Sequence, residues 1–387
     1  MKRSILNLDI DTFFVACERL NDSQLNKRPL IVGGSSDRGI VVSCSYEALR
    51  YNVRVGMPIS LALKLCSNAK VIKGDFDLYS KKSQEITEII KEKAPLMEKS
   101  SIQEFYVDMT GMDYHIGSVK WTNELIDRIK KESGLTMSYG LSINKTVSRI
   151  ATQEGRPFST KVIALPHVRP FLAPLSIRRI PKIRVQTSNS LHRIGIRKIK
   201  TLSETPVRTL TSLVGKKEAD DLWHKANGID HSPVVQHDEK KSISVDKTFE
   251  IDTLDIIGLK ACISSMGQKL CFQLRQANKL TSIVSLRIRY TNSDSESLRK
   301  RISYTSLDNV IIPILQQLFV KLYQRRMRLR SISITYAGLV AGNYQIDLFN
   351  DTTEYVALYQ AMDRMKARYG EKYIQMGNSL TTIKNDI

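Results

Sequence analysis

The feature that most constrains this sequence is a short apolar run near its start that carries two carboxylates. Residues 5–14 have the length and apolar content of a buried β-strand, yet the run includes Asp9 and Asp11. Side chains two positions apart on a strand point to the same face, about 7 Å from each other. Burying two acids together is costly without a cation, so Asp9 is predicted to bind a divalent metal. For Asp11 the alternative stays open that the strand ends early and that Asp11, helped by Thr12, caps the next helix.

A second stretch strengthens the metal prediction. Residues 100–111 also resemble a strand that is interrupted by acids, among them Glu104, and that ends on Thr110-Gly111. Two acid-bearing strands can meet in one sheet and gather carboxylates around an oxygen-seeking cation such as Mg²⁺. Such an arrangement is typical of two-metal phosphoryl or nucleotidyl transfer.

The charge balance points to a polyanionic partner. The 387 residues include 59 Lys and Arg against 39 Asp and Glu, a formal net charge of +20. Such an excess favours nucleic acid over a membrane surface, because no basic amphipathic helix with an aromatic insertion face is evident. No apolar run is long enough to span a bilayer, and no secretory signal is evident. The five cysteines are odd in number and lack metal-ligand spacing, which indicates unpaired thiols and a cytoplasmic location.

The order of patterns along the chain predicts several domains. Helices are expected at residues 46–51, 59–65, 79–93, 121–133, 259–277, 310–325 and 353–369. Short basic helices fill residues 168–232, where Ile194-Gly195-Ile196 is similar to half of a helix-hairpin-helix, and a polar tether follows at 233–241. Residues 242–336 have a β-α-β-β-α-β order, which predicts a ferredoxin-like split motif. Its cationic strands suit a phosphate backbone, with a solvated face as the alternative.

Taken together, four motifs resemble those of the Y-family of DNA polymerases, the translesion type, here of a bacterial kind. They are Asp9-Ile10-Asp11-Thr12-Phe13-Phe14, Tyr46-Glu47-Ala48, Ser101-Ile102-Gln103-Glu104-Phe105 and Gly140-Leu141-Ser142-Ile143-Asn144-Lys145. The resemblance covers essentially the whole chain in order. It implies an α+β multidomain fold, a right hand with a palm of sheet and helices, small fingers, a helical thumb and a ferredoxin-like little finger. The implied boundaries are palm 1–32 and 75–166, fingers 33–74, thumb 167–232, tether 233–241, little finger 242–340 and tail 341–387.

The resemblance also implies a role for individual residues. Asp9 and Glu104 would be catalytic and, with the Ile10 backbone carbonyl, would hold two Mg²⁺ ions, for which Mn²⁺ could substitute. Phe14 would be the steric gate beside Phe13 that selects deoxynucleotides, with an ordinary core aromatic as the alternative. Other implied ligands are Tyr46, Lys145 and Arg156 for the nucleotide, Arg287, Arg289, Arg301, Arg328 and Arg330 for DNA, and Gln345, Leu348 and Phe349 for the bacterial sliding clamp.

The sequence departs from the family pattern at several of these positions. Gln103 stands where the family has an Asp metal ligand, and loss of one charged group in a catalytic site typically costs on the order of 10²-fold in rate. Leu49 stands where the finger helix normally has an arginine, and Arg50 is turned by about 100° around the helix. Arg156-Pro157-Phe158-Ser159 replaces Lys-Pro-Asn-Gly. Lys182 and Arg184 replace glycines of the thumb hairpin, which puts its tight turn in question.

Two functions from different classes follow. The first is a monomeric, template-directed DNA polymerase of low processivity, which adds deoxynucleotides to a primer 3′ end during DNA damage tolerance and repair. The second, motivated by Gln103 and Leu49, is a clamp-anchored DNA-binding accessory protein of the same fold with an impaired catalytic centre. A nucleotidyl cyclase is a remoter alternative, since such an enzyme has no use for the basic thumb and the tether.

Overall fold

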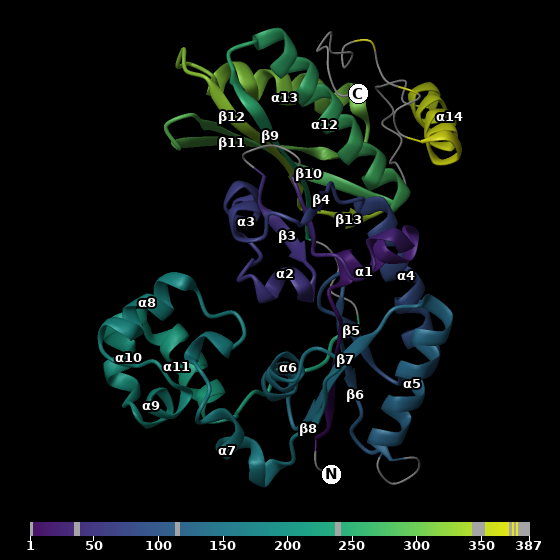
Figure 1. Ribbon diagram of the computed structural model, residues 1–387. Helices are drawn as coiled ribbons and strands as arrows, with labels where there is room; N and C mark the ends of the chain where they lie inside the picture. Colours follow the sequence, from purple (N-terminus) through teal and green to yellow (C-terminus); the bar gives the residue numbers. More distant parts are fainter. Residues whose placement is uncertain are drawn as a thin grey trace. The chain divides into compact units, whose positions relative to one another are not determined.

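The computed structural model describes residues 3–34, 39–112, 117–236, 241–342, 353–370, 374 and 377 of the chain (Figure 1). The chain forms two compact units, Met1–Asp238 and Glu239–Ile387, and each has its own hydrophobic cores. None of the helices in the described ranges has both the length and the apolarity that a membrane span requires. All five cysteines are free and buried, as the sequence predicted for unpaired thiols.

The first unit is organised around a five-stranded sheet in the order β5-β6-β1-β7-β8. The central strand β1 (Ile5–Ile10) is fully buried and runs antiparallel to β6 (Glu104–Asp108) and to β7 (Met137–Ser142). The edges are β5 (Met97–Lys99) and β8 (Thr160–Val162). Leu6, Leu8 and Ile10 pack into a core with the helices α1 (Phe13–Asn21), α4 (Phe76–Lys93) and α5 (Ser118–Ser133). Because side chains alternate along a strand, Asn7 and Asp9 point to the opposite face.

The helix α6 (Lys145–Glu154) lies against that opposite face of β1 and β7. Its close approach requires a glycine at position 140 of β7. A Cβ atom added there would collide with the backbone of Ser148 and would lie 2.7 Å from the Thr152 nitrogen. A side chain at this position would therefore push α6 off the sheet, and with it the residues that α6 presents to Asn7 and Asp9.

The start of α1 corrects one of the sequence interpretations. The strand ends at Ile10, as the alternative for Asp11 required, but Asp11 does not cap the helix. The residue at the N-cap is Thr12, with φ of 44°, and it makes no side-chain capping bond. The capping interpretation of Asp11 is therefore wrong, because its carboxylate has partners on other elements.

A smaller sheet, in the order β3-β2-β4, belongs to the same unit. It is built from β2 (Leu30–Gly33), β3 (Val41–Cys44) and β4 (Lys70–Ile72), with α2 (Tyr46–Arg50) and α3 (Ile59–Leu65) packed on it. Ser45 caps α2 by accepting a hydrogen bond from the Ala48 amide, which fixes where Tyr46 begins the helix.

A helical region completes the first unit. Its helices share one core, to which α6 contributes Val147 and Ile150. They are α7 (Val168–Leu172), α8 (Val185–Arg193), α9 (Ile199–Glu204), α10 (Val207–Val214) and α11 (Lys216–Ala226). Before α8, Lys182 adopts φ of 67°, so a tight turn forms there although glycine, which adopts this conformation without strain, is absent.

The second unit is a five-stranded antiparallel sheet with two helices on one face, and its short fifth strand β13 (Val340–Ala341) pairs with β10. Its chain order is β9 (Ser242–Thr253), α12 (Ile256–Gln276), β10 (Lys279–Tyr290), β11 (Ser295–Thr305), α13 (Asp308–Leu322) and β12 (Leu329–Ala337). The sheet order is β11-β10-β12-β9, so one strand lies between each pair that a helix connects. This is the predicted split arrangement. The helix predicted over 310–325 ends earlier, at Leu322, because Tyr323 adopts a ψ of 72°, outside the helical region.

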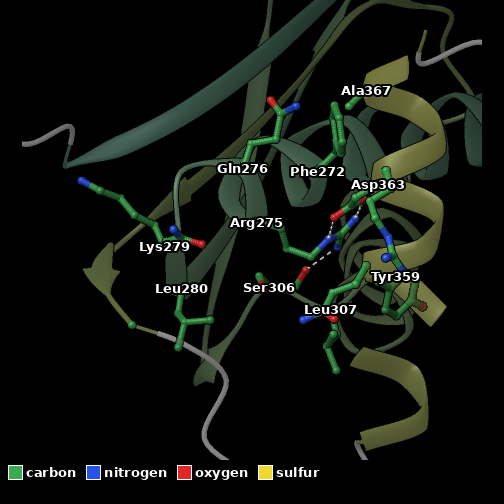
Figure 2. Close-up of a pocket in the computed structure, with 14 residues that line it drawn as sticks. Phe272, Arg275, Gln276, Lys279, Leu280, Ser306, Leu307, Tyr359, Asp363 and Ala367 are labelled. Atoms are coloured by element: carbon green, nitrogen blue, oxygen red, sulfur yellow. Dashed lines mark hydrogen bonds and ion pairs between the residues drawn. The ribbon is translucent and has the colours of Figure 1, made fainter. Parts of the chain in front are cut away.

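A final helix, α14 (Thr353–Tyr369), has the predicted bounds and packs beside α12 (Figures 1 and 2). Its contacts centre on Arg275 of α12, whose Nε and Nη2 donate to the Asp363 carboxylate at 2.6 and 2.9 Å. Tyr359 is buried, and the Arg275 guanidinium lies 5.0 Å from the centre of its ring. A cavity of about 480 Å³ lies beside these contacts. The predicted clamp-binding residues Gln345, Leu348 and Phe349 lie outside the described residues.

Candidate active site

The two predicted metal ligands lie directly opposite each other in the sheet. Asp9 of β1 is the Cα partner of Glu104 of β6, and both side chains are buried, with 5% and 3% of their surface exposed. This register brings together two acids that are 95 positions apart in the sequence. A carboxylate pair inside a sheet is strongly unfavourable unless cations or donors compensate it. The remaining side chains of the site supply those groups.

Asp9 is held by one amide and one guanidinium. Gln103 Nε2 donates to Asp9 Oδ1 at 3.2 Å, and the guanidinium of Arg156 forms an ion pair with Oδ2. Burial raises the pKa of Asp9 to about 6, although Arg156 opposes this effect, and the nearby Glu104 charge adds to it. The position at which the family would have a third carboxylate is therefore adjacent to Asp9, as the sequence predicted, but its amide contributes no charge.

Glu104 has three neighbours, and all three contact the same oxygen. Asn7 Nδ2 donates to Glu104 Oε1 at 3.1 Å, and the Tyr106 hydroxyl donates to the same atom at 3.3 Å. Arg149 Nε of α6 lies 3.0 Å from Oε1 as an ion pair. No hydrogen bond in the described ranges involves Oε2.

A second group of contacts surrounds Asp11. Its Oδ1 accepts hydrogen bonds from Ser138 Oγ at 2.7 Å and from the Tyr46 hydroxyl at 3.3 Å, and its Oδ2 accepts one from the Phe158 amide at 3.3 Å. Arg156 Nε lies 3.9 Å from Oδ1. Arg156 therefore lies between Asp9 and Asp11. Two predicted nucleotide ligands, Tyr46 from α2 and Arg156 from the loop after α6, meet at one carboxylate.

The structure does not bring every predicted residue into this cluster. Lys145 forms an ion pair with Glu98 and lies 5.2 Å from the centre of the Tyr106 ring, one step removed from Glu104. Phe13 is buried in the core. Phe14 is half-buried, and its ring lies 4.6 Å from that of Tyr79. The steric gate at Phe14 stays a prediction, and so does its alternative as a core aromatic.

The predicted DNA-binding arginines belong to the second unit. Val284, Leu286 and Ile288 of β10 point into its core, so Arg287 and Arg289 face away from the helices and are exposed. Arg301 of β11 and Arg328, just before β12, are also exposed. Arg330 differs from the other four because it is half-buried and lies 3.5 Å from the Asp252 carboxylate. Its charge is thus partly used within the unit.

Two residues of the site, Asn7 and Arg149, were not predicted. Their spacing from predicted site residues in the sequence could have identified both. Asn7 precedes Asp9 by two positions in an apolar strand and therefore shares its face. Arg149 follows Lys145 by four positions on α6, so the two lie on one side of the helix. Neither residue belongs to the motifs on which the resemblance rested.

The donor set of the site fits a hard divalent cation. Asp9, Glu104 and Gln103 offer oxygen atoms as ligands, the type that Mg²⁺ prefers. Oε2 of Glu104 makes no hydrogen bond in the described ranges and could bind such a cation. The raised pKa of Asp9 is an effect of burial, which outweighs the opposing effect of the ion pair with Arg156. In the described ranges, no three His, Cys, Asp or Glu side chains form a group that could hold a metal by themselves. An ion here would therefore need the amide, a backbone carbonyl, substrate oxygens or water as further ligands.

Two family models match the chain over most of its length. Residues 8–153 match the impB/mucB/samB family, and residues 240–348 match the C-terminal domain of the same family. The chain belongs to this family. The prediction of a bacterial Y-family DNA polymerase is thereby confirmed, and so is its translesion type. Enzymes of this family depend on divalent metals.

Individual relatives and solved structures agree with this assignment. The chain is 30% identical to a DNA polymerase IV of Clostridium kluyveri, with 100% of each chain covered, and 31% identical to one of Streptococcus pneumoniae, with 87% of this chain and 97% of the relative covered. A Y-family DNA polymerase chimera matches with a TM-score of 0.77 at 22% identity, covering 88% of this chain and all of the other. The predicted fold class, an α+β right hand, is confirmed.

Proposed function

We propose that this chain catalyses template-directed addition of deoxynucleotides to a primer 3′ end and that Asp9 and Glu104 form the centre of the reaction. The observation that carries the proposal is the register of β1 and β6, which places these two acids side by side in a fold of the polymerase family. The substrates are primer-template DNA and deoxynucleoside triphosphates. One solved relative, at 22% identity, is an insertion ternary complex of a DNA polymerase.

Asp9, Glu104, the Gln103 amide and the Ile10 backbone carbonyl would hold the catalytic Mg²⁺ ions, two in the family pattern, with Mn²⁺ as a substitute. Bound there, such ions would acidify the primer 3′-hydroxyl and would stabilise the charge of the departing pyrophosphate. Glu104 Oε2 is the oxygen that is available for this purpose, since Oε1 already has three neighbours. Gln103 brings an oxygen but no charge, so metal affinity at this site rests on two carboxylates.

The groups around Asp11 suit the triphosphate. Arg156 and Tyr46 converge there from two different elements, and each can turn from a carboxylate to a phosphate oxygen, which is also an anionic acceptor. Arg156 Nε is buried, has no hydrogen-bond partner and lies 3.9 Å from Asp11 Oδ1, so it can donate to a ligand, whereas the terminal nitrogen Nη2 already forms the ion pair with Asp9. Phe14 would then exclude a 2′-hydroxyl. Because Leu49 removes the usual arginine of the finger helix, Arg156 carries more of the phosphate charge.

The second unit would bind the DNA backbone. Arg287, Arg289, Arg301 and Arg328 are exposed, and the face of the sheet that carries Arg287 and Arg289 is the one without helices. Counterion release from phosphates would make this binding strongly salt-dependent. Gln345, Leu348 and Phe349 would anchor the chain to a sliding clamp as an extended peptide.

The alternative function, a DNA-binding accessory protein, has one specific observation in its favour. Both predicted metal ligands are paired with arginines, Asp9 with Arg156 and Glu104 with Arg149, in a site that has lost one carboxylate. If these ion pairs held the acids permanently, the fold would bind DNA without performing chemistry.

Primer extension decides between the two. The full-length chain is incubated with a primed template and deoxynucleotides in Mg²⁺ or Mn²⁺, next to Asp9→Ala and to Glu132→Ala, which removes an exposed carboxylate of the same unit that pairs with Arg128. We expect extension by the unchanged chain and by Glu132→Ala, and none by Asp9→Ala. DNA binding without extension in either metal would refute the enzyme and support the accessory protein.

A further inference from the structure

Glu104 and Asp9 differ in which of their carboxylate oxygens contact neighbouring side chains. The neighbours of Asp9 are divided between its two oxygens, with Gln103 on Oδ1 and Arg156 on Oδ2. Those of Glu104 all lie on Oε1. A carboxylate that is held by one oxygen has a fixed orientation and keeps the other oxygen for a ligand.

The three groups on Oε1 come from three elements that pack rigidly together. Asn7 lies in β1 and is fully buried, Tyr106 lies in β6 and is 5% exposed, and Arg149 lies on α6. We infer that Asn7, Tyr106 and Arg149 form a clamp that positions Glu104 for catalysis, and that Arg149 is the charged member of this clamp. The inference rests on the proposed polymerase function.

The groups that contact Glu104 Oε1 are themselves held in place by other contacts. The Tyr106 hydroxyl donates to Glu104 Oε1, and the Tyr106 side chain is buried. Asn7 Nδ2 also contacts the Phe105 carbonyl at 3.4 Å, which leaves little freedom for its amide to turn away. Lys145, held by Glu98, covers the Tyr106 ring at 5.2 Å and so limits the movement of that ring. Each partner of Glu104 is therefore itself held in place.

Arg149 has a different kind of contact. Its Nε lies 3.0 Å from Oε1, yet this buried nitrogen has no partner with hydrogen-bond geometry. The attraction is therefore one of charge, at a site where Gln103 has already removed one negative charge. A cation here opposes metal binding by Coulomb repulsion. Its benefit must lie in orienting Glu104, and this predicts that removing it slows chemistry without weakening the metal.

The test compares Arg149→Met, which removes the charge and keeps most of the side-chain length, with Arg149→Lys, which restores the charge. We expect Arg149→Met to lower kcat for single-nucleotide insertion about tenfold, as loss of an outer partner of a metal ligand typically does. The nucleotide KM should change by less than about twofold, because the triphosphate contacts are elsewhere. Arg149→Lys should have a kcat between those of the unchanged chain and Arg149→Met.

Two further variants keep the test independent of folding defects. Tyr106→Phe retains the ring under Lys145 and removes only the hydroxyl, so kcat should fall about threefold, the usual effect of one neutral hydrogen bond. Arg128→Met removes an arginine of the same unit that pairs with Glu92 and Glu132, and it should leave kcat unchanged. An unchanged kcat in Arg149→Met, or a raised KM at constant kcat, would overturn the clamp. The second result would make Arg149 a phosphate ligand instead.

A readout that needs no turnover separates this inference from the proposed function. Mn²⁺ binding to the full-length protein, followed by electron paramagnetic resonance, should be as tight or tighter in Arg149→Met than in the unchanged chain, and weaker in Glu104→Gln. Weaker binding in Arg149→Met would overturn the clamp even if the enzyme is active. If the unchanged chain extends no primer, the proposed function fails, while tighter Mn²⁺ binding in Arg149→Met would still place Arg149 on the Glu104 carboxylate.

Discussion

Each unit of this chain contains a cluster of arginine and buried carboxylates, and the two clusters differ in how completely they are satisfied. In the second unit, Arg275 uses every nitrogen of its guanidinium. Nε and Nη2 donate to Asp363, and Nη1 donates to the Ser306 carbonyl at 2.8 Å (Figure 2). Nη1 also donates to Asp308 at 3.0 Å. In the first unit, buried nitrogens of Arg149 and Arg156 have no hydrogen-bond partner, and Glu104 Oε2 has none either.

The difference separates a structural cluster from a candidate catalytic one. A network in which the guanidinium is fully used gains its energy within the fold, and in the Arg275 cluster Asp308 Oδ1 is the buried oxygen that has no hydrogen-bond partner. An open network is less favourable for stability, since buried polar groups without partners cost free energy, and it persists where a ligand completes it. The Arg275 cluster fixes α14 to its unit, whereas the Asp9 and Glu104 cluster has groups left to bind a metal and phosphates.

The sharpest way to break this comparison is Asp9→Asn. This change in the cluster of Asp9 and Glu104 should abolish primer extension. The extension rate should fall about 10³-fold or more, because a charged group of the catalytic centre is lost. The free energy of unfolding, measured in denaturant without metal, should be unchanged or higher, because the amide is cheaper to bury. A loss of stability with retained extension would show that Asp9 is structural.

In the Arg275 cluster, substitution is expected to lower stability and to leave activity unchanged. Arg275→Met leaves the buried Asp308 and the partly exposed Asp363 without their arginine, so the second unit should lose about 3 kcal/mol of unfolding free energy. The kcat for nucleotide insertion, corrected for the folded fraction, should remain within about twofold, because no atom of the reaction contacts this residue. Chemical denaturation followed by circular dichroism measures the first effect. An unchanged unfolding free energy would contradict the structural assignment.

The pH dependence of stability sharpens the comparison. Burial raises the pKa of Asp9 from 3.8 to about 6, so between these values the folded state binds more protons than the unfolded state. The contribution of Asp9 to the free energy of unfolding is therefore fully present at low pH. It is lost as the pH rises toward 6, and the loss amounts to up to about 3 kcal/mol. Relative to the unchanged chain, Asp9→Asn should gain more stability at pH 8 than at pH 4 when metal is chelated. An equal gain at both pH values would show that the Asp9 pKa is not raised.

Restoring the family carboxylate is expected to have the smallest effect. Gln103→Asp adds a charge beside Asp9 and should raise the extension rate in Mg²⁺ about tenfold, since the amide now donates to Asp9 without contributing charge. Half-saturation should occur at a lower Mg²⁺ concentration. Steady-state extension over a Mg²⁺ series measures both, and an unchanged or lower rate would mean that position 103 is not part of the metal site.

Much of this picture could be predicted from the sequence because it depends on local patterns. The apolar periods predicted β1, β6 and the bounds of α14, and the motif order predicted the family. Gln103 was predicted as a metal ligand and Arg156 as a nucleotide ligand because motifs included them, but their contacts with Asp9 were not predicted. Long-range pairing is a different matter. That Arg275 would join Asp363 across 88 positions depends on how α14 packs, which no local pattern encodes.

Two errors in the sequence prediction have local physical causes. Asp11 followed a strand and preceded a helix, which is a typical N-cap position, but its carboxylate contacts Ser138 and Tyr46 instead. The helix α13 was expected to reach Arg325. It ends at Leu322, because Tyr323 adopts a ψ of 72°, outside the helical region.

The most direct test of the account is a crystal structure of the full-length chain with primer-template DNA, a non-hydrolysable deoxynucleotide and Mn²⁺. The account predicts an anomalous peak bound by Asp9 and by Glu104 Oε2, with Arg156 turned from Asp9 to the triphosphate and Arg149 still on Oε1. If the two acids kept only their arginine partners and no metal lay between them, the central claim that they form a catalytic metal site would be contradicted.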